Sequence, residues 1–140
     1  MTFKTYQKEL KIKTHKPFEF INITKNIQNE IEKSRISNGV VTINVLHTTA
    51  AIALQEKDTT VHDDSGMILE KLISINENYS HSYEGKINGA AHQRQQLIGS
   101  TCTIPIHNKE LILGTWQQIF LIELFQPMPR NIFVTVIGEL

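Results

Sequence analysis

The chain has 140 residues, a mass of 16.0 kDa, 40% hydrophobic residues, and 14 basic against 14 acidic residues. A chain of this length can bury about two thirds of its unfolded surface, so we expect a single domain over residues 1–140 and exclude a disordered or fibrous chain. The equal numbers of basic and acidic residues give no support to a protein that binds nucleic acid. The sequence has one cysteine and lacks both an apolar leader and an apolar run long enough to cross a bilayer. We therefore expect a cytoplasmic protein without membrane contact.

The first third of the sequence predicts strands around one helix. Apolar and polar residues alternate from Tyr6 to Ile12, which indicates a half-exposed strand, and a second strand is expected from Phe18 to Ile23. Thr24 is placed to cap the helix that follows. The segment from Val40 to Leu46 is β-branched and apolar on both faces, as in a central strand.

The middle of the sequence predicts two helices joined by a long loop. Asp58 is a suitable cap for the first helix, whose apolar stripe consists of Val61, Ser65, Ile68, Leu69 and Leu72. The polar stretch from Asn76 to Asn88 indicates a long loop, and long loops inside compact domains often carry function. A short helix is expected from about Ala90 to Ile98.

The last part of the sequence predicts three strands. They run from Ser100 to Ile106, from Leu111 to Glu123 with Gly114 as a bulge, and from Ile132 to Ile137. The fold class is therefore α+β, an antiparallel sheet system with two or three helices on one side.

Histidines are the first candidates for a functional site. His47 ends the apolar strand on the same side as Val41 and Val45, where an imidazole is held rigidly near a rim, as a metal ligand or general base requires. The alternative is a core-edge histidine hydrogen-bonded to a carbonyl.

His81 and His92 bracket the long loop. Together with His47 they would supply the three protein ligands of an open zinc-type site, although their spacing is not a metal-binding signature. The other three histidines, His15, His62 and His107, are expected to be solvated.

Several other residues are weighed as structural or functional candidates. Asp64, one and a half helical turns after the cap residue Asp58, is a candidate for an acid that orients a histidine. Cys102 alternates with core-type isoleucines, which predicts a buried, inert thiol. The lone tryptophan, Trp116, is either a core aromatic beside a bulge or a pocket wall, with the Gln117 amide as a hydrogen-bonding arm.

Several strings together resemble the YjbQ family, which is named for secondary thiamine-phosphate synthase activity. They are His47-Thr48-Thr49-Ala50-Ala51-Ile52, Tyr79-Ser80-His81-Ser82-Tyr83-Glu84-Gly85, Asn88-Gly89-Ala90-Ala91-His92 and Gly114-Thr115-Trp116-Gln117. The resemblance runs in order over nearly the whole chain. It departs at Ala90, where the family often has an aspartate.

The resemblance implies a YjbQ-like fold with sandwich-like antiparallel sheets, assembled as a homotrimer. It also implies a histidine cluster near the subunit boundaries that binds a divalent metal, zinc or magnesium. Carried onto this sequence, the metal ligands are His47, His81 and His92. The catalytic candidates are His47, Asp64 and Glu123, and the substrate-binding candidates are Thr48, Arg94, Trp116 and Gln117.

The reaction implied by the resemblance is a transfer onto a phosphorylated small molecule. Thiamine phosphate formation joins a pyrimidine methyl diphosphate to a thiazole phosphate, so cations must surround the departing diphosphate. Lys86, Arg94 and Arg130 are the candidates. The alternative function is a non-catalytic module that binds a metal or a small ligand.

Overall fold

The computed structural model describes residues 2–140 and confirms the α+β class. The strands are β1 (Phe3–Lys13), β2 (Glu19–Asn22), β3 (Asn38–Val45), β4 (Ala50–Glu56), β5 (Thr101–His107), β6 (Glu110–Leu111), β7 (Gln117–Glu123) and β8 (Pro129–Glu139). The helices are α1 (Thr24–Ser34), α2 (Thr59–Leu72) and α3 (Lys86–Ile98).

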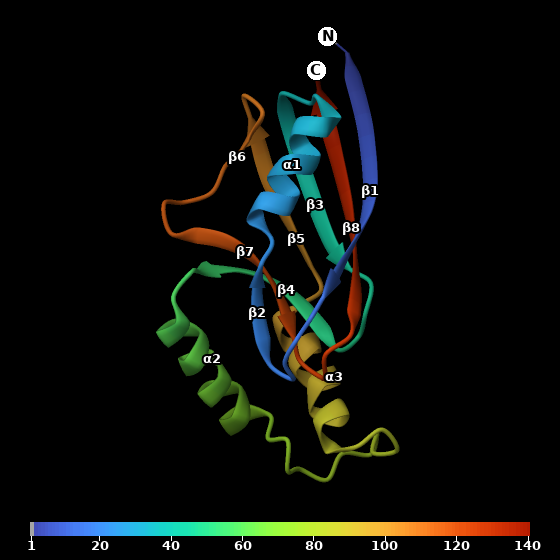
Figure 1. Cartoon of the computed structure of the whole chain (residues 1–140), viewed down its shortest axis with the longest axis vertical. Helices are drawn as coiled ribbons and strands as arrows, with labels where there is room; N and C mark the ends of the chain where they lie inside the picture. Colours follow the sequence, from blue (N-terminus) through green and yellow to red (C-terminus); the bar gives the residue numbers. More distant parts are fainter. Residues whose placement is uncertain (1) are drawn as a thin grey trace.

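The strands form two antiparallel sheets (Figure 1). One sheet has five strands in the order β1-β8-β3-β5-β6, and the other has three in the order β2-β7-β4. The chain passes from the first sheet to the second where β3 ends and β4 begins. That crossing, at residues 46–49, is one wall of the candidate site described below.

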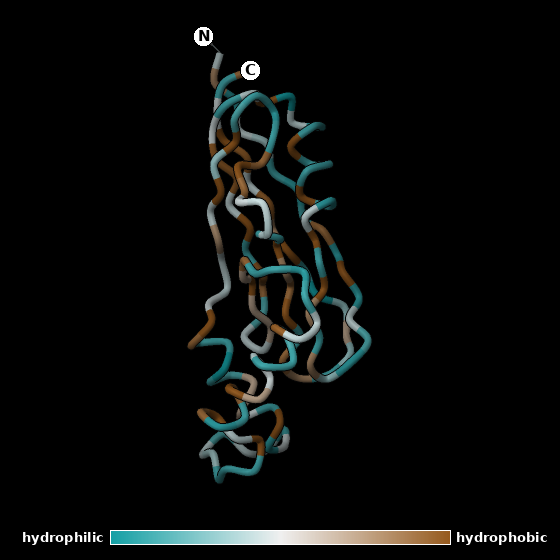
Figure 2. The backbone as a smooth tube through the Cα atoms, turned by 90° about the vertical axis from the view of Figure 1, so that its left-hand side faces the viewer, coloured by the Kyte–Doolittle hydropathy of each residue, from teal (hydrophilic) through white to brown (hydrophobic). Residues whose placement is uncertain are grey.

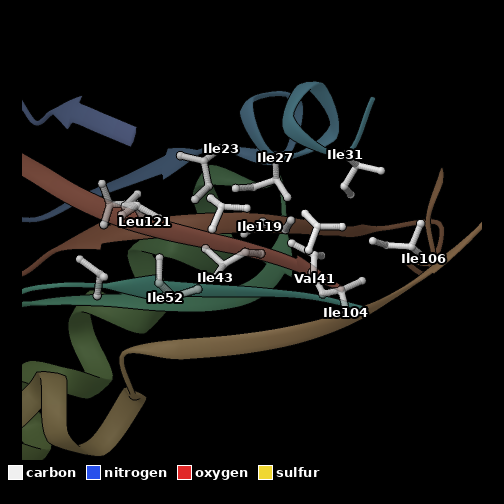
Figure 3. Packing of buried hydrophobic residues seen from close by; sticks show 14 of the residues in the cluster. Ile23, Ile27, Ile31, Val41, Ile43, Ile52, Ile104, Ile106, Ile119 and Leu121 are labelled. Atoms are coloured by element: carbon white, nitrogen blue, oxygen red, sulfur yellow. The ribbon is translucent and has the colours of Figure 1, made fainter. Parts of the chain in front are cut away.

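The three-stranded sheet lies in the middle of the packing because β7 is apolar on both faces. Ile119 and Leu121 belong to the main core with the five-stranded sheet and α1, and Figure 3 shows Ile27 of α1 directed toward this core. Phe120 and Ile122, on the opposite face of β7, join a second cluster with residues of α2 and α3. Figure 2 shows hydrophobic residues recurring along the strands.

One strand of the structure was not predicted, and two predicted elements have different bounds. β4 was not predicted, because its run of alanine, isoleucine and leucine has no strict alternation. The segment predicted as one strand from Leu111 to Glu123 is divided into β6 and β7 by a connection at residues 112–116. The helix predicted from Ala90 is α3, which begins at Lys86.

The two helix caps have different outcomes. Asp58 caps α2 as predicted, since its carboxylate accepts the backbone N–H of Thr60 at 2.8 Å. The prediction for Thr24 is wrong, because α1 has no side-chain cap and the Thr24 hydroxyl accepts the backbone N–H of Ile119 at 2.8 Å. Thr24 therefore joins α1 to β7.

Helix α2 is also less buried than its apolar stripe predicted. Only Leu69 is buried, whereas Ile68 and Leu72 are exposed. His62, which was expected to be solvated, lies flat against Phe20 with ring centroids 4.2 Å apart, and its Nε2 bonds to the Glu56 carbonyl at 2.8 Å.

Among residues 2–140, no helix has both the length and the apolar character needed to cross a bilayer.

Cys102 points toward the main core from β5, as predicted. Burial raises the pKa of its thiol to about 11, so almost no thiolate exists at neutral pH. We expect a thiol reagent at pH 7.5 to label the native protein far more slowly than the urea-unfolded protein. Labelling at equal rates, followed by absorbance, would contradict this burial.

Candidate functional site

A pocket of about 730 Å³ opens at the seam between the two sheets. Its walls come from the β3–β4 connection, the loop at residues 81–84, the first half of α3, and the segment that enters β8. His47, His81 and His92 all line this pocket. The structure therefore brings together three histidines that are far apart in the sequence.

Three side chains of this pocket form a group that could hold a metal ion. The ligand atoms of His81, Glu84 and His92 all lie within 4.8 Å of one another. Two imidazoles and one carboxylate are a common ligand set for zinc in catalytic sites, with a fourth position left open. His47, which the resemblance implies as the third ligand, is not part of this group, whose third ligand atom comes from Glu84.

Helix α3 orients this group through two residues that share one face. Asn88 and His92 are four residues apart, so their side chains lie one above the other. The Asn88 Oδ1 atom can only accept a hydrogen bond, so His81 Nε2, 3.0 Å away, carries the proton. The Nδ1 lone pair of a neutral His81 is then free for a ligand.

Gly89 lets the loop that carries His81 pack against α3. A Cβ atom at Gly89 would lie 2.9 Å from the His81 carbonyl oxygen and 3.0 Å from the Tyr79 side chain. Any larger residue would push the loop off the helix and separate His81 from His92, whose ring centroids are 4.7 Å apart.

The opposite wall of the pocket contains a buried ion pair. Arg130 is 1% exposed and donates from Nε to Glu123 Oε1 at 2.8 Å, with a second, shorter hydrogen bond from Nη2 to Oε2. Glu123 also accepts the Thr14 hydroxyl at 2.7 Å and the backbone N–H groups of Leu124 and Phe125. Each carboxylate oxygen thus has at least two donors, which compensates for the loss of water.

Arg130 links this ion pair to the pocket. Its Nη2 also donates to the carbonyl and hydroxyl oxygens of Thr49, at 3.2 and 3.0 Å. Within residues 2–140, Nη1 makes no hydrogen bond, and Arg130 lines the pocket. Nη1 is therefore the part of the guanidinium left to bind an anionic ligand.

His47 lies beside this cation and is neutral at physiological pH. Burial, followed by the positive charge of Arg130, lowers the pKa of His47 below its usual value. Its Nε2 accepts the backbone N–H of Asn131 at 2.9 Å, so the proton of the neutral ring is on Nδ1. His47 can therefore donate a hydrogen bond from Nδ1, which suits an anion better than a metal ion.

Of the remaining predicted site residues, Thr48 lines the pocket and Glu123 stands behind it as the partner of Arg130. Asp64 is exposed on α2 and lies outside the pocket lining. Arg94 is directed elsewhere, because it donates to Glu70 at 2.8 Å and to the Ile73 carbonyl at 2.7 Å.

Trp116 and Gln117 are also outside the pocket of their own chain. Trp116 is 71% exposed, so it is not the core aromatic that the sequence offered as one alternative, and it forms no wall of the pocket within its own chain. The Gln117 side chain accepts the Gly114 backbone N–H at 2.8 Å and stabilises the turn that carries Trp116.

Two residues of the site, Glu84 and Asn88, were not singled out from the sequence. Both lie in the stretch from His81 to His92, so a search for ligands and their partners near those histidines could have found them. The role of Arg130 depends on its hydrogen bonds to Glu123, seven residues away, and to Thr49. No short sequence motif predicts these two contacts.

Comparison with known proteins gives consistent results along the whole chain. A family model described as UPF0047 protein YjbQ-like matches residues 8–139. The chain is similar to a UPF0047 protein of Methanothermobacter thermautotrophicus, with 34% identity over 96% of this chain and 93% of the relative. It is also similar to a UPF0047 protein of Methanocaldococcus jannaschii, with 40% identity over 91% of each chain.

Two crystal structures have the same fold. A YbjQ-like protein of unknown function from Sulfolobus solfataricus P2 superposes with a TM-score of 0.93 at 31% identity, covering 99% of this chain and 100% of the other. A YjbQ/UPF0047 family protein from Clostridium acetobutylicum gives a TM-score of 0.86 at 35% identity, covering 91% and 98%.

The buried ion pair gives a stability prediction. Glu123→Gln removes the charge that compensates Arg130 in a site without water, so the free energy of unfolding should fall by about 3–5 kcal/mol. Urea denaturation measures this loss.

A matched control is Glu70→Gln, which weakens an Arg–Glu pair whose carboxylate is half exposed. Water can replace that partner, so the loss should be much smaller. Equal losses of unfolding free energy in the two variants would contradict the prediction that burial makes the Arg130–Glu123 pair more important for stability.

Proposed function

The chain belongs to the UPF0047/YjbQ-like family, and we propose that its pocket is a metal-assisted active site for a phosphorylated small molecule. The observation that carries the proposal is the presence of two different groups in one pocket. His81, Glu84 and His92 supply metal ligands, and Arg130 with His47 supplies hydrogen-bond donors for an anion. A phosphate group and a divalent cation are the pair of ligands that such donors and acceptors match.

The ligand atoms favour zinc over magnesium. Imidazole nitrogen is a good ligand for Zn²⁺, whereas Mg²⁺ prefers oxygen ligands and retains most of its water. A zinc ion bound there would neutralise negative charge that develops on a phosphate leaving group. Asn88 would fix the orientation of His81 through its hydrogen bond.

The reaction implied by the family resemblance is transfer of the thiamine-phosphate synthase type. In it the thiazole nitrogen forms a bond to the methylene carbon of the pyrimidine, and the carbon–oxygen bond breaks with its electron pair leaving on diphosphate. This chain supports such a step by binding the diphosphate through Arg130 Nη1 and His47 Nδ1–H. Glu123 holds the guanidinium in position and does not contact the ligand.

The proposal includes a homotrimer in the cytoplasm. The outward face of the five-stranded sheet supports assembly, because its centre is uncharged and is not covered by a helix of residues 2–140. Val40 and Ile137, paired on adjacent strands, are 40% and 46% exposed there. A core-facing single cysteine fits a reducing compartment.

Metal binding is the direct test of the site. Protein purified without a histidine tag should bind Zn²⁺ or Co²⁺ in calorimetry, and His81→Ala or His92→Ala should abolish binding without unfolding the chain. Asn88→Ala should weaken binding by about 10–100-fold, because His81 loses its orientation. His107→Ala, at the exposed end of β5, is the control.

His47→Ala separates the two halves of the site. It should leave the metal affinity unchanged and weaken the binding of inorganic phosphate, because it removes only an N–H donor. Loss of metal binding in this variant would instead show that His47 is a metal ligand. Binding of both ligands without release of diphosphate from the two thiamine precursors would favour a non-catalytic binding module.

The homotrimer is tested by sedimentation velocity at micromolar concentration. We expect a species of three chains, and Val40→Glu should dissociate it by placing a charge in the centre of the uncovered sheet face. Gln96→Glu, on the exposed side of α3, is the charge-matched control. A stable wild-type monomer would contradict the assembly.

A further inference from the structure

Trp116 is displayed on a turn that is already formed in the single chain. The Gln117 N–H donates to the Gly114 carbonyl at 3.1 Å, and the Gly114 N–H donates to the Gln117 side chain at 2.8 Å. Trp116 nevertheless packs on no aromatic ring of residues 2–140 and is 71% exposed. A rigid turn that presents an uncovered indole is typical of an anchor for a partner surface.

The turn has an uncharged surface. Ile112, at the start of the β6–β7 connection, is 50% exposed, and residues 112–117 contain no charged side chain. The surface that receives this turn must therefore offer apolar side chains for the indole and Ile112, together with an acceptor for the indole N–H.

The pocket described above has a mixed lining, in which apolar side chains lie at the rim among polar ones. Tyr83 is 81% exposed and Leu46 is 46% exposed, and Phe125 and Met128 also line the opening. The carboxylate of Glu84 lies on the same side and can accept a hydrogen bond. The rim thus offers both the apolar contact and the acceptor that the turn needs.

The turn and the pocket lie on opposite flanks of the molecule. In Figure 1 the β6–β7 connection projects to the left, whereas the β3–β4 connection that borders the pocket lies to the right. One chain cannot bring these two surfaces together. A head-to-tail contact between copies can, and repetition of that contact around an axis closes a ring.

We propose that the Trp116 turn of one copy packs over the rim of the metal pocket of the next copy and completes its wall. This inference rests on the proposed homotrimer. It explains why Trp116 and Gln117 lie outside the pocket of their own chain although the sequence pointed to them as site residues. It also implies that the isolated monomer has an open, incomplete site.

Mixed oligomers test the contact, because Trp116 is the only tryptophan. Trp116→Phe chains bind metal but have no indole, and His92→Ala chains have the indole but bind no metal. Refolded together, they place an indole beside an intact metal site only across a subunit contact. Co²⁺, which quenches nearby indoles, should then remove much of the fluorescence of the mixture and leave both parent proteins unchanged.

A relocated tryptophan is the control. Phe3 is 70% exposed, close to the value for Trp116, so Phe3→Trp in a Trp116→Phe chain moves the indole to an equally exposed position away from the turn. Its fluorescence should not respond to Co²⁺. Equal quenching of the control, or an unquenched mixed trimer, would overturn the proposal.

Failure of the metal site would be recognised separately. If wild-type protein binds no Co²⁺, the metal proposal fails, and the contact is then tested by the emission of Trp116 in the assembled protein. Emission that shifts to longer wavelength when the trimer is diluted to monomers supports burial of the indole by a neighbour. Emission of a solvated indole in the intact trimer would overturn it.

Discussion

The buried pair of Arg130 and Glu123 fixes the geometry on which the pocket depends. Two charges without water cost free energy unless all their hydrogen-bonding groups find partners. Here Glu123, at the end of β7, accepts a hydrogen bond from Thr14, which follows β1. Arg130 donates to Thr49, which precedes β4. The pair therefore holds in register the chain segments that meet at the seam between the sheets. An apolar pair of the same size would fill the space without orienting a cation toward the pocket.

The side of the pocket that carries the candidate metal ligands was the more predictable side because it is local in sequence. His81, Glu84, Asn88 and His92 lie within twelve residues, and an α-helix places residues four apart on one face. The opposite side, with Arg130 and His47, is built from the ends of β3, β7 and β8, whose meeting depends on sheet topology. Sequence patterns indicated that His47 ends a strand, but not that the Asn131 N–H would occupy its Nε2.

The errors in predicting β4 and the segment around Trp116 also arise from contacts that a single sequence does not show. Periodicity identified strands with one exposed face, such as β1, and failed for β4, which is apolar on both faces because it lies between the main core and the second cluster. It also treated Trp116 as part of a strand, since an apolar residue was assumed to face the core. A chain that buries surface against another copy breaks that assumption, and a single sequence carries no label for such residues.

The two buried arginines show why burial alone does not identify a ligand-binding cation. Arg94 directs its Nε and Nη2 to the Ile73 carbonyl and to Glu70, so it anchors the start of the loop that carries His81. Arg130 also anchors a loop, through Thr49, but it lines the pocket with Nη1 unbonded within residues 2–140. Both guanidinium groups therefore position the walls of the site, and both leave Nη1 unbonded within residues 2–140, but only Arg130 lines the pocket. The candidate cation for a ligand is thus distinguished by its place in the pocket lining and not by burial or by an unbonded Nη1.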